Sequence, residues 1–377
     1  MLIGIEAERA NNPQKTGVEH YAKQLILHLA EIDRVNNYVL YLRAAPEPWL
    51  KNLPENFKIK VLPFPIFWTQ LRISWELLFH PVDVLLIPAS ALPLIHPKNS
   101  VVTIHDLAWK FYPETFTTFN RNFLEYSTRF AVKRARHIIA VSESTKRDLV
   151  KFYKVDPSKI VVVHHGYESA DQQVSISAPT LDKVEVGAPT TNVGASQLAI
   201  PEKYVLFLST LQPRKNLEGL IDAFVDLKKE HPELPHKLVV VGRAGWKFES
   251  ILQKIEAHKD LVLYLNHVKD AERIAIMKQA DCMVLPSFYE GFGMTILEAF
   301  AAGVPVATSN VSSMPEVAGE AAVYFDPHNK AQIKNAIKNI LFDKSLAENL
   351  KQKGVERLKQ FSWKKCAEET LKILTNH

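Results

Sequence analysis

Short runs of apolar, β-branched residues alternate with amphipathic helical patterns along almost the whole chain. Val84–Ile87 and Cys282–Leu285 are typical runs, whereas Val18–Ala30 places apolar residues three or four positions apart. The first pattern predicts buried strands and the second predicts helices with one face on a core. Strands that alternate with helices form parallel sheets, because each helix returns the chain to the edge where the next strand begins. The sequence therefore predicts an α/β fold.

The expected elements form two sets, one in each half of the chain. In the first half we expect strands near Leu2–Ile5, Tyr38–Leu42, Ile59–Leu62, Val84–Ile87, Val101–Ile104, Ile138–Val141 and Ile160–Val163. In the second half we expect strands near Val205–Ser209, Leu238–Val241, Val262–Leu265, Cys282–Leu285, Val306–Thr308 and Val323–Phe325. The clearest expected helices are Val18–Ala30, Asn120–Ala135, Ser142–Phe152, Leu217–Lys229, Ala271–Ala280 and Met294–Ala302.

Length and a change in composition indicate two domains. The chain has 377 residues, and Ser169–Ile200 contains no aromatic residue and only four charged ones. We interpret this stretch as a linker, with a short edge strand around Val184 as the alternative. The expected divisions are residues 1–170 and 201–360 for two Rossmann-like domains that face a cleft, 171–200 for the linker, and 361–377 for a terminal helix. In such an architecture ligands bind at the carboxyl ends of the strands.

The net charge of +5 is concentrated in the first half. Residues 1–170 contain 21 Lys and Arg against 16 Asp and Glu, whereas the remainder is balanced at 25 of each. A basic half suits an anionic partner, either a phospholipid surface or a phosphorylated acceptor. The alternative is a mildly basic solvated face. No Lys/Arg cluster is dense enough to follow a nucleic-acid backbone, so we expect no nucleic-acid partner.

Cysteine content and hydropathy bear on location. The two cysteines, Cys282 and Cys366, are too few for a disulfide framework, which favours a reducing compartment. The first residues lack the basic start of a signal peptide. The longest apolar stretch, Val84–Ile95, has 12 residues, fewer than the roughly 20 that span a bilayer. We expect a cytoplasmic protein, with peripheral attachment to the inner face of a membrane as an option.

One aromatic stretch is open to two interpretations. Phe64–Trp75 combines large apolar side chains with Arg72. It can form a helix that packs on the first domain. Alternatively, it can dock on a membrane interface or hold a lipid-linked acceptor.

The strongest chemical signal is the segment that follows the strand Cys282–Leu285. Gly291-Phe292-Gly293 predicts a tight turn, and the helix expected after it would present free N–H groups to an anion such as phosphate. Glu290 precedes the turn, and Glu298 lies about one helical turn beyond it. The two carboxylates can bind different parts of one ligand, sugar hydroxyls and ribose hydroxyls. The alternative is two solvated glutamates beside a turn.

Two further pairs of polar residues follow expected strands. Arg214 and Lys215 come after Val205–Ser209, where two cations can neutralise a diphosphate leaving group. His105 and Asp106 end the strand Val101–Ile104. The alternatives are a basic helix start on the surface and a structural His-Asp pair.

These residues belong to a set of motifs that resembles one family. Glu290 and Glu298 match the E-x7-E signature of retaining glycosyltransferases of the GT-B fold, in the large family 4 group. The order and spacing of the other motifs agree along nearly the whole chain. They are Thr16-Gly17-Val18, Thr103-Ile104-His105-Asp106, Val141-Ser142-Glu143-Ser144, Leu211-Gln212-Pro213-Arg214-Lys215-Asn216, Gly242-Arg243-Ala244-Gly245-Trp246 and Ser312-Ser313-Met314-Pro315-Glu316.

The resemblance implies a role for each candidate residue. Lys215 and Arg214 would bind the donor diphosphate in the second domain, together with the Gly291-Phe292-Gly293 turn. His105 would contact the transferred sugar, and Asp106 would orient it or help to bind the acceptor on the first domain. Gly17 would let the backbone approach the donor phosphate or the acceptor.

The sequence departs from the family pattern at two places. Ser209 and Thr210 stand where some relatives have an additional Arg, and His164-His165 stand where relatives often have Pro-Asn. A metal at the His pair is disfavoured, because no matching ligands appear. No Asp-x-Asp motif is present, so we expect no metal or other cofactor beyond the nucleotide-diphosphate sugar that serves as donor.

The resulting hypothesis is a retaining hexosyltransferase that moves a hexose from a nucleotide-diphosphate sugar to a glycan or lipid-linked acceptor. The motifs resemble those of bacterial mannosyltransferases of surface polysaccharide synthesis, which favours GDP-mannose over a UDP-hexose. The alternatives are a GT-B-like sugar-nucleotide epimerase or hydrolase without an acceptor, and a non-catalytic binding module. Front-face attack and double displacement both remain open as mechanisms.

Overall fold

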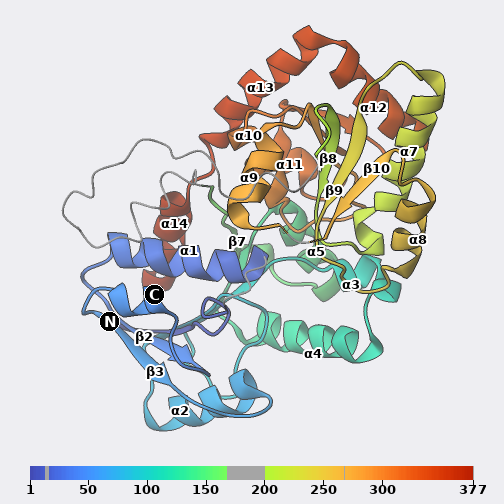
Figure 1. Ribbon diagram of the computed structural model, residues 1–377. Coiled ribbons are helices and arrows are strands. Elements are labelled where there is room, and N and C mark those ends of the chain that lie inside the picture. Colours follow the sequence, from blue (N-terminus) through green and yellow to red (C-terminus); the bar gives the residue numbers. More distant parts are fainter. Residues whose placement is uncertain (13–16, 168–199, 267, 377) are drawn as a thin grey trace. The chain divides into compact units, whose positions relative to one another are not determined.

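The computed structural model describes residues 1–12, 17–167, 200–266 and 268–376 (Figure 1). They form two compact units. The first contains residues 1–12, 17–111, 117–167 and 361–376, and the second contains 112–116, 200–266 and 268–360. The expected linker 171–200 lies outside the described residues except for Ile200, and so does the alternative edge strand around Val184. Thr16 also lies outside the described residues.

The first unit is built on a seven-stranded parallel sheet in the order β3-β2-β1-β4-β5-β6-β7. Its strands are β1 (Leu2–Glu6), β2 (Asn37–Leu42), β3 (Phe57–Val61), β4 (Val84–Ile87), β5 (Ser100–Ile104), β6 (His137–Ala140) and β7 (Ile160–Val162). The central strands β4 and β5 are buried along their whole length, which explains their continuous apolar sequence.

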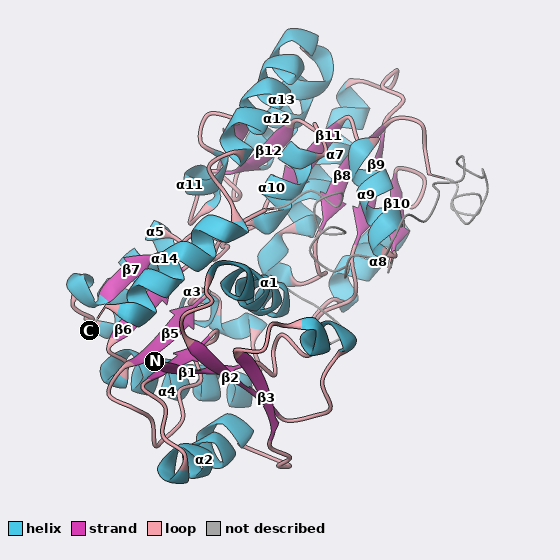
Figure 2. Cartoon of the chain, turned by 90° about the vertical axis from the view of Figure 1, so that its left-hand side faces the viewer, coloured by secondary structure: helices cyan, strands magenta, loops and turns pink. Residues whose placement is uncertain are grey.

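Helices cover both faces of this sheet. They are α1 (Gly17–Ile32), α2 (Ser74–Phe79), α3 (Ala108–Phe111), α4 (Thr118–Arg134), α5 (Glu143–Tyr153) and α14 (Trp363–Thr375). Figures 1 and 2 show α1 and α14 on one face and α2 and α4 on the other. Side-chain oxygens of Thr117 and Ser142 cap α4 and α5 by accepting bonds from backbone N–H groups.

The helix α14 completes the first unit, although it follows the second unit in sequence. It packs against α1, and the Trp363 ring lies 5.6 Å from that of His20 and 5.8 Å from that of His165. Gly166 permits this approach, because a Cβ atom there would lie 1.9 Å from the Trp363 nitrogen.

The second unit has a six-stranded parallel sheet in the order β10-β9-β8-β11-β12-β13. Its strands are β8 (Tyr204–Leu208), β9 (Lys237–Val241), β10 (Val262–Leu265), β11 (Cys282–Leu285), β12 (Val306–Ser309) and β13 (Ala322–Phe325). Its helices are α7 (Leu217–Glu230), α8 (Glu249–Ala257), α9 (Asp270–Lys278), α10 (Met294–Ala301), α11 (Met314–Ala318), α12 (Lys330–Phe342) and α13 (Lys344–Leu358). The helices α7 and α12 pack together over one buried core, and α10 packs against α9, α11 and α13.

The aromatic stretch forms a π-helical turn, Trp68–Ile73, that continues into α2. Trp68, Ile73 and Leu77 are buried on the first unit, as expected for a packed helix. Six large apolar side chains of the same segment are nevertheless exposed, and we call them the apolar ridge. They are Ile66, Phe67, Leu71, Trp75, Leu78 and Phe79, with exposed fractions between 45% and 64%.

Candidate active site

The candidate donor site lies at the carboxyl edge of the second sheet. The strands β8 and β11 are neighbours, so the loops that follow them leave the sheet side by side. After β8 the chain forms a single 3-10 turn, Pro213–Lys215, and Asn216 then adopts a left-handed conformation before α7. This turn directs Arg214 and Lys215 toward the loop that follows β11, where both bond to Glu290.

Glu290 is the centre of a buried ionic cluster. Its Oε1 lies 2.6 Å from Lys215 Nζ and accepts a 2.6 Å bond from the Ser287 hydroxyl, and its Oε2 lies 3.3 Å from an Arg214 nitrogen. Only 8% of Glu290 is exposed. Burial raises the pKa of this carboxyl, but the charges of Lys215 and Arg214 outweigh burial and lower the pKa to about 2. Glu290 is therefore ionised.

Two serines fix the backbone around this cluster. The Ser312 hydroxyl accepts a 2.8 Å bond from the Glu290 N–H and donates a 2.7 Å bond to the Glu290 carbonyl. The Ser313 hydroxyl lies 2.9 Å from the carbonyls of both Glu290 and Phe292. Sequence reasoning assigned no role to Ser287 or to this serine pair, although the pair lies within one of the quoted motifs.

The Gly291-Phe292-Gly293 turn leads directly into α10. Gly293 has φ +98° and occupies the N-cap position of α10 without a side-chain cap. Phe292 is buried, with 4% of its surface exposed, so its side chain belongs to the core. Any contact of Phe292 with a ligand must therefore come from its backbone. Donor binding by this turn stays a prediction.

Glu298 belongs to a second ion pair, with Arg273 of α9. Their closest atoms, Arg273 Nη1 and Glu298 Oε1, are 2.6 Å apart, and Arg273 also lies 3.7 Å from Asp270. Glu298 is thus held by an arginine that the sequence did not single out. Residues 25 positions apart on different helices give no spacing signal that would have linked them.

In the first unit, His105 follows β5 at the carboxyl edge of the sheet. Its Nε2 lies 2.8 Å from the Pro88 carbonyl, which can only accept, so Nε2 carries the proton. Burial lowers the pKa of His105 against the opposing effect of the Pro88 carbonyl and Asp106, which favours the neutral ring. Neutral His105 therefore presents Nδ1 as a hydrogen-bond acceptor. Asp106 uses Oδ1 to accept the Ala108 N–H, at the start of α3.

Aromatic rings surround His105. The Tyr21 ring meets it edge-on at 4.9 Å and stacks on the His165 ring at 4.8 Å. His165 in turn stacks on Trp363, and burial lowers its pKa well below the usual value. His165 is thus a packing residue, and His164 contacts Phe361. Within the described ranges, no group of three or more His, Cys, Asp or Glu side chains is arranged to hold a metal ion.

Gly17 is the first residue of α1 and is exposed. A Cβ atom built there would meet no atom within 4 Å. Packing within the protein therefore does not require glycine at this position, and a role for Gly17 in ligand approach stays a prediction.

Glu6, at the end of β1, gives a testable pH dependence. Burial is the main cause that raises its pKa to about 7, well above the 4.5 of an exposed glutamate. The folded state therefore holds a proton that the unfolded state loses, and stability falls by about 3 kcal/mol as the pH rises from 4.5 through 7. Glu6→Gln should unfold near the wild-type temperature at pH 5 and at a higher temperature at pH 8. Thermal unfolding measures both temperatures, and Glu31→Gln, a change at an exposed glutamate, is the control. A change in unfolding temperature that is equal at the two pH values would contradict the assignment.

Two parallel α/β units, one with paired cations at a carboxyl edge and one with a half-buried histidine there, define a glycosyltransferase of the GT-B fold. The family comparisons agree along the chain. Residues 15–170 match the model "Glycosyltransferase Family 4", and residues 192–357 match "Glycosyl transferases group 1". The protein belongs to the family 4, group 1 glycosyltransferases, and it is a hexosyltransferase.

Curated relatives point to the same class. The chain is 30% identical over 278 residues to O-antigen chain mannosyltransferase B of Escherichia coli, covering 73% of this chain and 69% of the relative. It is 27% identical over 276 residues to the O-antigen chain mannosyltransferase RfbU of Salmonella typhimurium, with the same coverage. These relatives are transferases, so the alternative of an epimerase or hydrolase has no support from them.

Solved structures confirm the predicted fold of two Rossmann-like domains. WaaG, a glycosyltransferase involved in lipopolysaccharide biosynthesis, superposes with a TM-score of 0.70 at 16% identity, with all of both chains covered. Anabaena Alr3699/HepE in complex with UDP and glucose superposes with a TM-score of 0.69 at 17% identity, covering 100% of this chain and 99% of HepE.

Proposed function

We propose that this protein transfers a hexose with retention of configuration, from a nucleotide-diphosphate sugar bound by the second unit to an acceptor bound by the first. The observation that carries the proposal is the cluster of Arg214, Lys215 and Glu290. It places two cations and one ionised carboxylate at a carboxyl edge where parallel α/β sheets bind ligands.

The cluster supports an exchange of partners on donor binding. A diphosphate offers Arg214 and Lys215 more negative charge than one carboxylate does, so it competes with Glu290 for them. Glu290 stays ionised and can then favour the positive charge that develops on the sugar ring. The two cations serve the leaving diphosphate without a metal ion, and the absence of a metal cofactor is part of this proposal.

Mannose is the sugar that we favour, with GDP as the nucleotide. The support is similarity alone: two relatives are named O-antigen chain mannosyltransferases. HepE, of the same fold, was solved with UDP and glucose, so a UDP-hexose is the second candidate. The relatives' names refer to O-antigen chains, which supports a glycan acceptor, and we propose a lipid-linked glycan as one form of it.

A panel of sugar nucleotides in a thermal-shift assay tests the donor. A ligand at 100 times its dissociation constant stabilises the folded protein by about 2.7 kcal/mol, an easily measured shift. GDP-mannose is expected to give the largest shift. Transfer of labelled sugar to an acceptor extract, with NMR of the product anomer, then tests retention. No shift with any nucleotide would refute the proposal.

Glu298 should bind the ribose, which is common to all sugar donors that carry the same nucleotide. Glu298→Gln removes the charge that pairs with Arg273 and should weaken free nucleoside diphosphate and intact donor by the same factor, roughly tenfold. Calorimetry with both ligands measures this. The matched control is exposed Glu256→Gln of α8, which also pairs with one cation. Loss of donor affinity alone would contradict the assignment.

We also propose that the first unit attaches to an anionic membrane surface through the apolar ridge. Leu94 and Ile95 extend the exposed apolar surface, because their N–H groups bond to Gln70 and Ser74 beside the ridge. They line a hollow with Lys98 and Arg134, and neither cation lies within ion-pair distance of a described carboxylate. Apolar side chains flanked by cations are complementary to anionic lipid. Within the described part of the chain, no helix is long and apolar enough to cross a membrane.

Liposome co-sedimentation tests the attachment. The wild type should pellet with anionic vesicles at low salt and much less at high salt or with neutral vesicles. Trp75→Ser with Phe79→Ser should reduce pelleting severalfold, whereas Val355→Ser, an exposed apolar residue of α13, should not. Equal, negligible pelleting with both vesicle types would refute the proposal.

A further inference from the structure

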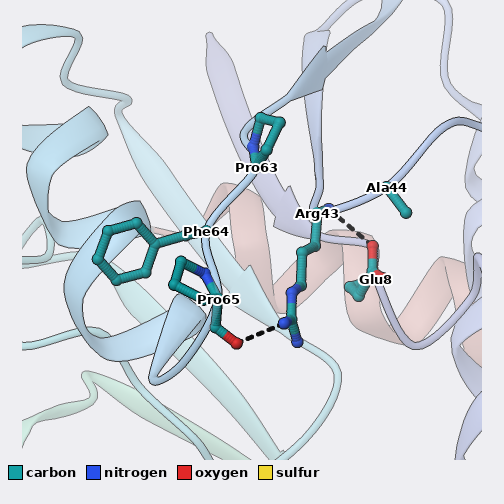
Figure 3. Close-up of a pocket in the computed structure, with 6 residues that line it drawn as sticks. All are labelled: Glu8, Arg43, Ala44, Pro63, Phe64 and Pro65. Carbon is teal, nitrogen blue, oxygen red and sulfur yellow. Dashed lines mark hydrogen bonds between the residues drawn. The ribbon is translucent and has the colours of Figure 1, made fainter.

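A hollow of about 640 Å³ lies beside the apolar ridge in the first unit, lined by Glu8, Arg43, Ala44 and Pro63–Pro65 (Figure 3). Arg43 follows β2, Glu8 follows β1, and Pro63–Pro65 follow β3. Since all three strands are parallel, the hollow lies at the carboxyl edge of the sheet. It shares this edge with His105, which follows β5.

Arg43 gives the hollow a guanidinium group that is not paired with a carboxylate, although the Glu8 carboxylate lines the same hollow. One of its guanidinium nitrogens donates to the Pro65 carbonyl, and its backbone N–H donates a 2.7 Å bond to Glu8 Oε2. No carboxylate of the described residues lies within 4 Å of the guanidinium. The bond to the Pro65 carbonyl fixes one nitrogen of the guanidinium group, and Figure 3 shows the Arg43 side chain extended between Glu8 and Pro65. A fixed guanidinium without a carboxylate partner is suited to a phosphate.

The remaining lining matches the two groups on either side of a phosphate in a glycolipid. Glu8 supplies carboxylate oxygens, which accept bonds from sugar hydroxyls. Phe64 is exposed on the side of Pro65 away from the guanidinium, and the next two residues, Ile66 and Phe67, begin the apolar ridge. The surface therefore changes from polar to cationic to apolar over a few residues.

The distance along the sheet edge suits an acceptor that reaches His105. In the order β2-β1-β4-β5, three strand spacings separate the loop of Arg43 from that of His105. At about 4.8 Å per spacing this is roughly 14 Å. A phosphate bound by Arg43 would thus leave room for a short glycan whose far end lies beside His105.

We infer that the Arg43 hollow binds the phosphate group of a lipid-linked acceptor, with the first sugar at Glu8 and the lipid chain passing over the apolar ridge into the membrane. This inference rests on the proposed function, because it names the acceptor of that reaction. It adds a subsite that recognises the phosphate of the acceptor separately from the phosphates of the donor.

Binding of farnesyl diphosphate to the full chain tests the subsite without any transfer reaction. Calorimetry is run with saturating GDP or UDP present, so that Arg214 and Lys215 are occupied. Farnesyl diphosphate supplies phosphate and lipid together, whereas inorganic diphosphate and farnesol supply one each. We expect the wild type to bind farnesyl diphosphate at least tenfold more tightly than either part.

Arg43→Gln should weaken farnesyl diphosphate roughly 10- to 100-fold, the span expected for bonds to a charged group, and leave farnesol unchanged. Arg43→Lys keeps the positive charge but lacks the planar guanidinium, so its affinity for farnesyl diphosphate should lie between those of the wild type and Arg43→Gln. Arg34→Gln is the matched control, since Arg34 is an exposed arginine in the loop before β2, at the opposite edge of the sheet. Trp75→Ser with Leu71→Ser should weaken farnesyl diphosphate and leave inorganic diphosphate unchanged.

The outcomes separate this inference from the proposed function. Equal binding of farnesyl diphosphate by wild type and Arg43→Gln overturns the subsite, even if sugar transfer is observed. Equal binding of inorganic and farnesyl diphosphate shows a site for free phosphate and also overturns it. Failure of every sugar nucleotide to bind refutes the donor proposal instead, and farnesyl diphosphate binding that depends on Arg43 would still show a lipid-phosphate site.

Discussion

Lys215→Ala is expected to lower kcat by roughly 10²–10³ while changing donor KM much less. The negative charge of the leaving diphosphate grows toward the transition state, so the bond from Lys215 strengthens there. Removal of one preorganised donor of this kind costs that factor in other enzymes. In the free protein the same lysine holds Glu290 at 2.6 Å, so its ammonium group is already positioned before the donor arrives. Initial-rate kinetics with varied donor measure the two constants.

Lys254→Ala is the matched control for this change. Lys254 of α8 also forms a 2.6 Å ion pair, with Asp222, but lies away from the carboxyl-edge loops. Its loss should leave both constants near the wild-type values. If Lys215→Ala raises KM and leaves kcat intact, then the lysine binds ground state and transition state equally, and its proposed role in the leaving-group step is wrong.

Glu290→Gln is expected to lower turnover by roughly 10² and to leave binding of free nucleoside diphosphate unchanged or tighter. The amide keeps the side-chain volume but removes the charge that faces the sugar in our proposal. It also releases Arg214 and Lys215 from their carboxylate partner, so a diphosphate meets less competition. Calorimetry with nucleoside diphosphate and kinetics with the full donor measure the two effects. Weakening of free nucleotide as large as that in Glu298→Gln would show that both carboxylates serve binding.

The same variant should lose stability when no ligand is bound. Breaking a buried ion pair from one side costs roughly 3–5 kcal/mol, because charges are left without a partner. Nucleoside diphosphate should restore much of this loss. In the wild type the pKa of about 2 means that the contribution of Glu290 is complete above pH 4.5 and is lost as the pH falls toward 2. The acid limb of thermal stability should therefore be flatter in Glu290→Gln.

Buried parallel strands were the most predictable part of the fold. Val84–Ile87 and Cys282–Leu285 are buried throughout and have the predicted bounds, as does the partly buried edge strand Val262–Leu265. Their runs are apolar on both faces and end abruptly at Pro, Asn or Gly-containing loops, so the pattern marks both ends. Helix ends were less accurate: α1 extends to Ile32 rather than Ala30, because its last turn is amphipathic rather than apolar.

Partners within the site could not be inferred from sequence. The resemblance located Arg214, Lys215 and Glu290, yet assigned them to different parts of a ligand. Their mutual ion pair depends on the left-handed Asn216 and on the pairing of β8 with β11, which no local pattern encodes. Arg273 beside Glu298 is a tertiary contact of the same kind. The aromatic stretch was likewise ambiguous, because Trp68, Ile73 and Leu77 are buried whereas the six large side chains of the apolar ridge are exposed.

The return of α14 to the first unit has a consequence for how the protein is made. A ribosome completes residues 1–167 long before it reaches Trp363, so the newly made first half lacks the ring that stacks on His165 and the backbone that fills the space beside Gly166. Apart from residues 112–116, the described part of the second unit is synthesised in between. The strands and helices of the second unit are continuous in sequence apart from residues 112–116, so this unit can form its native core first. The first unit can complete its packing only after α14 has been synthesised, and until then the surface that α14 covers stays exposed.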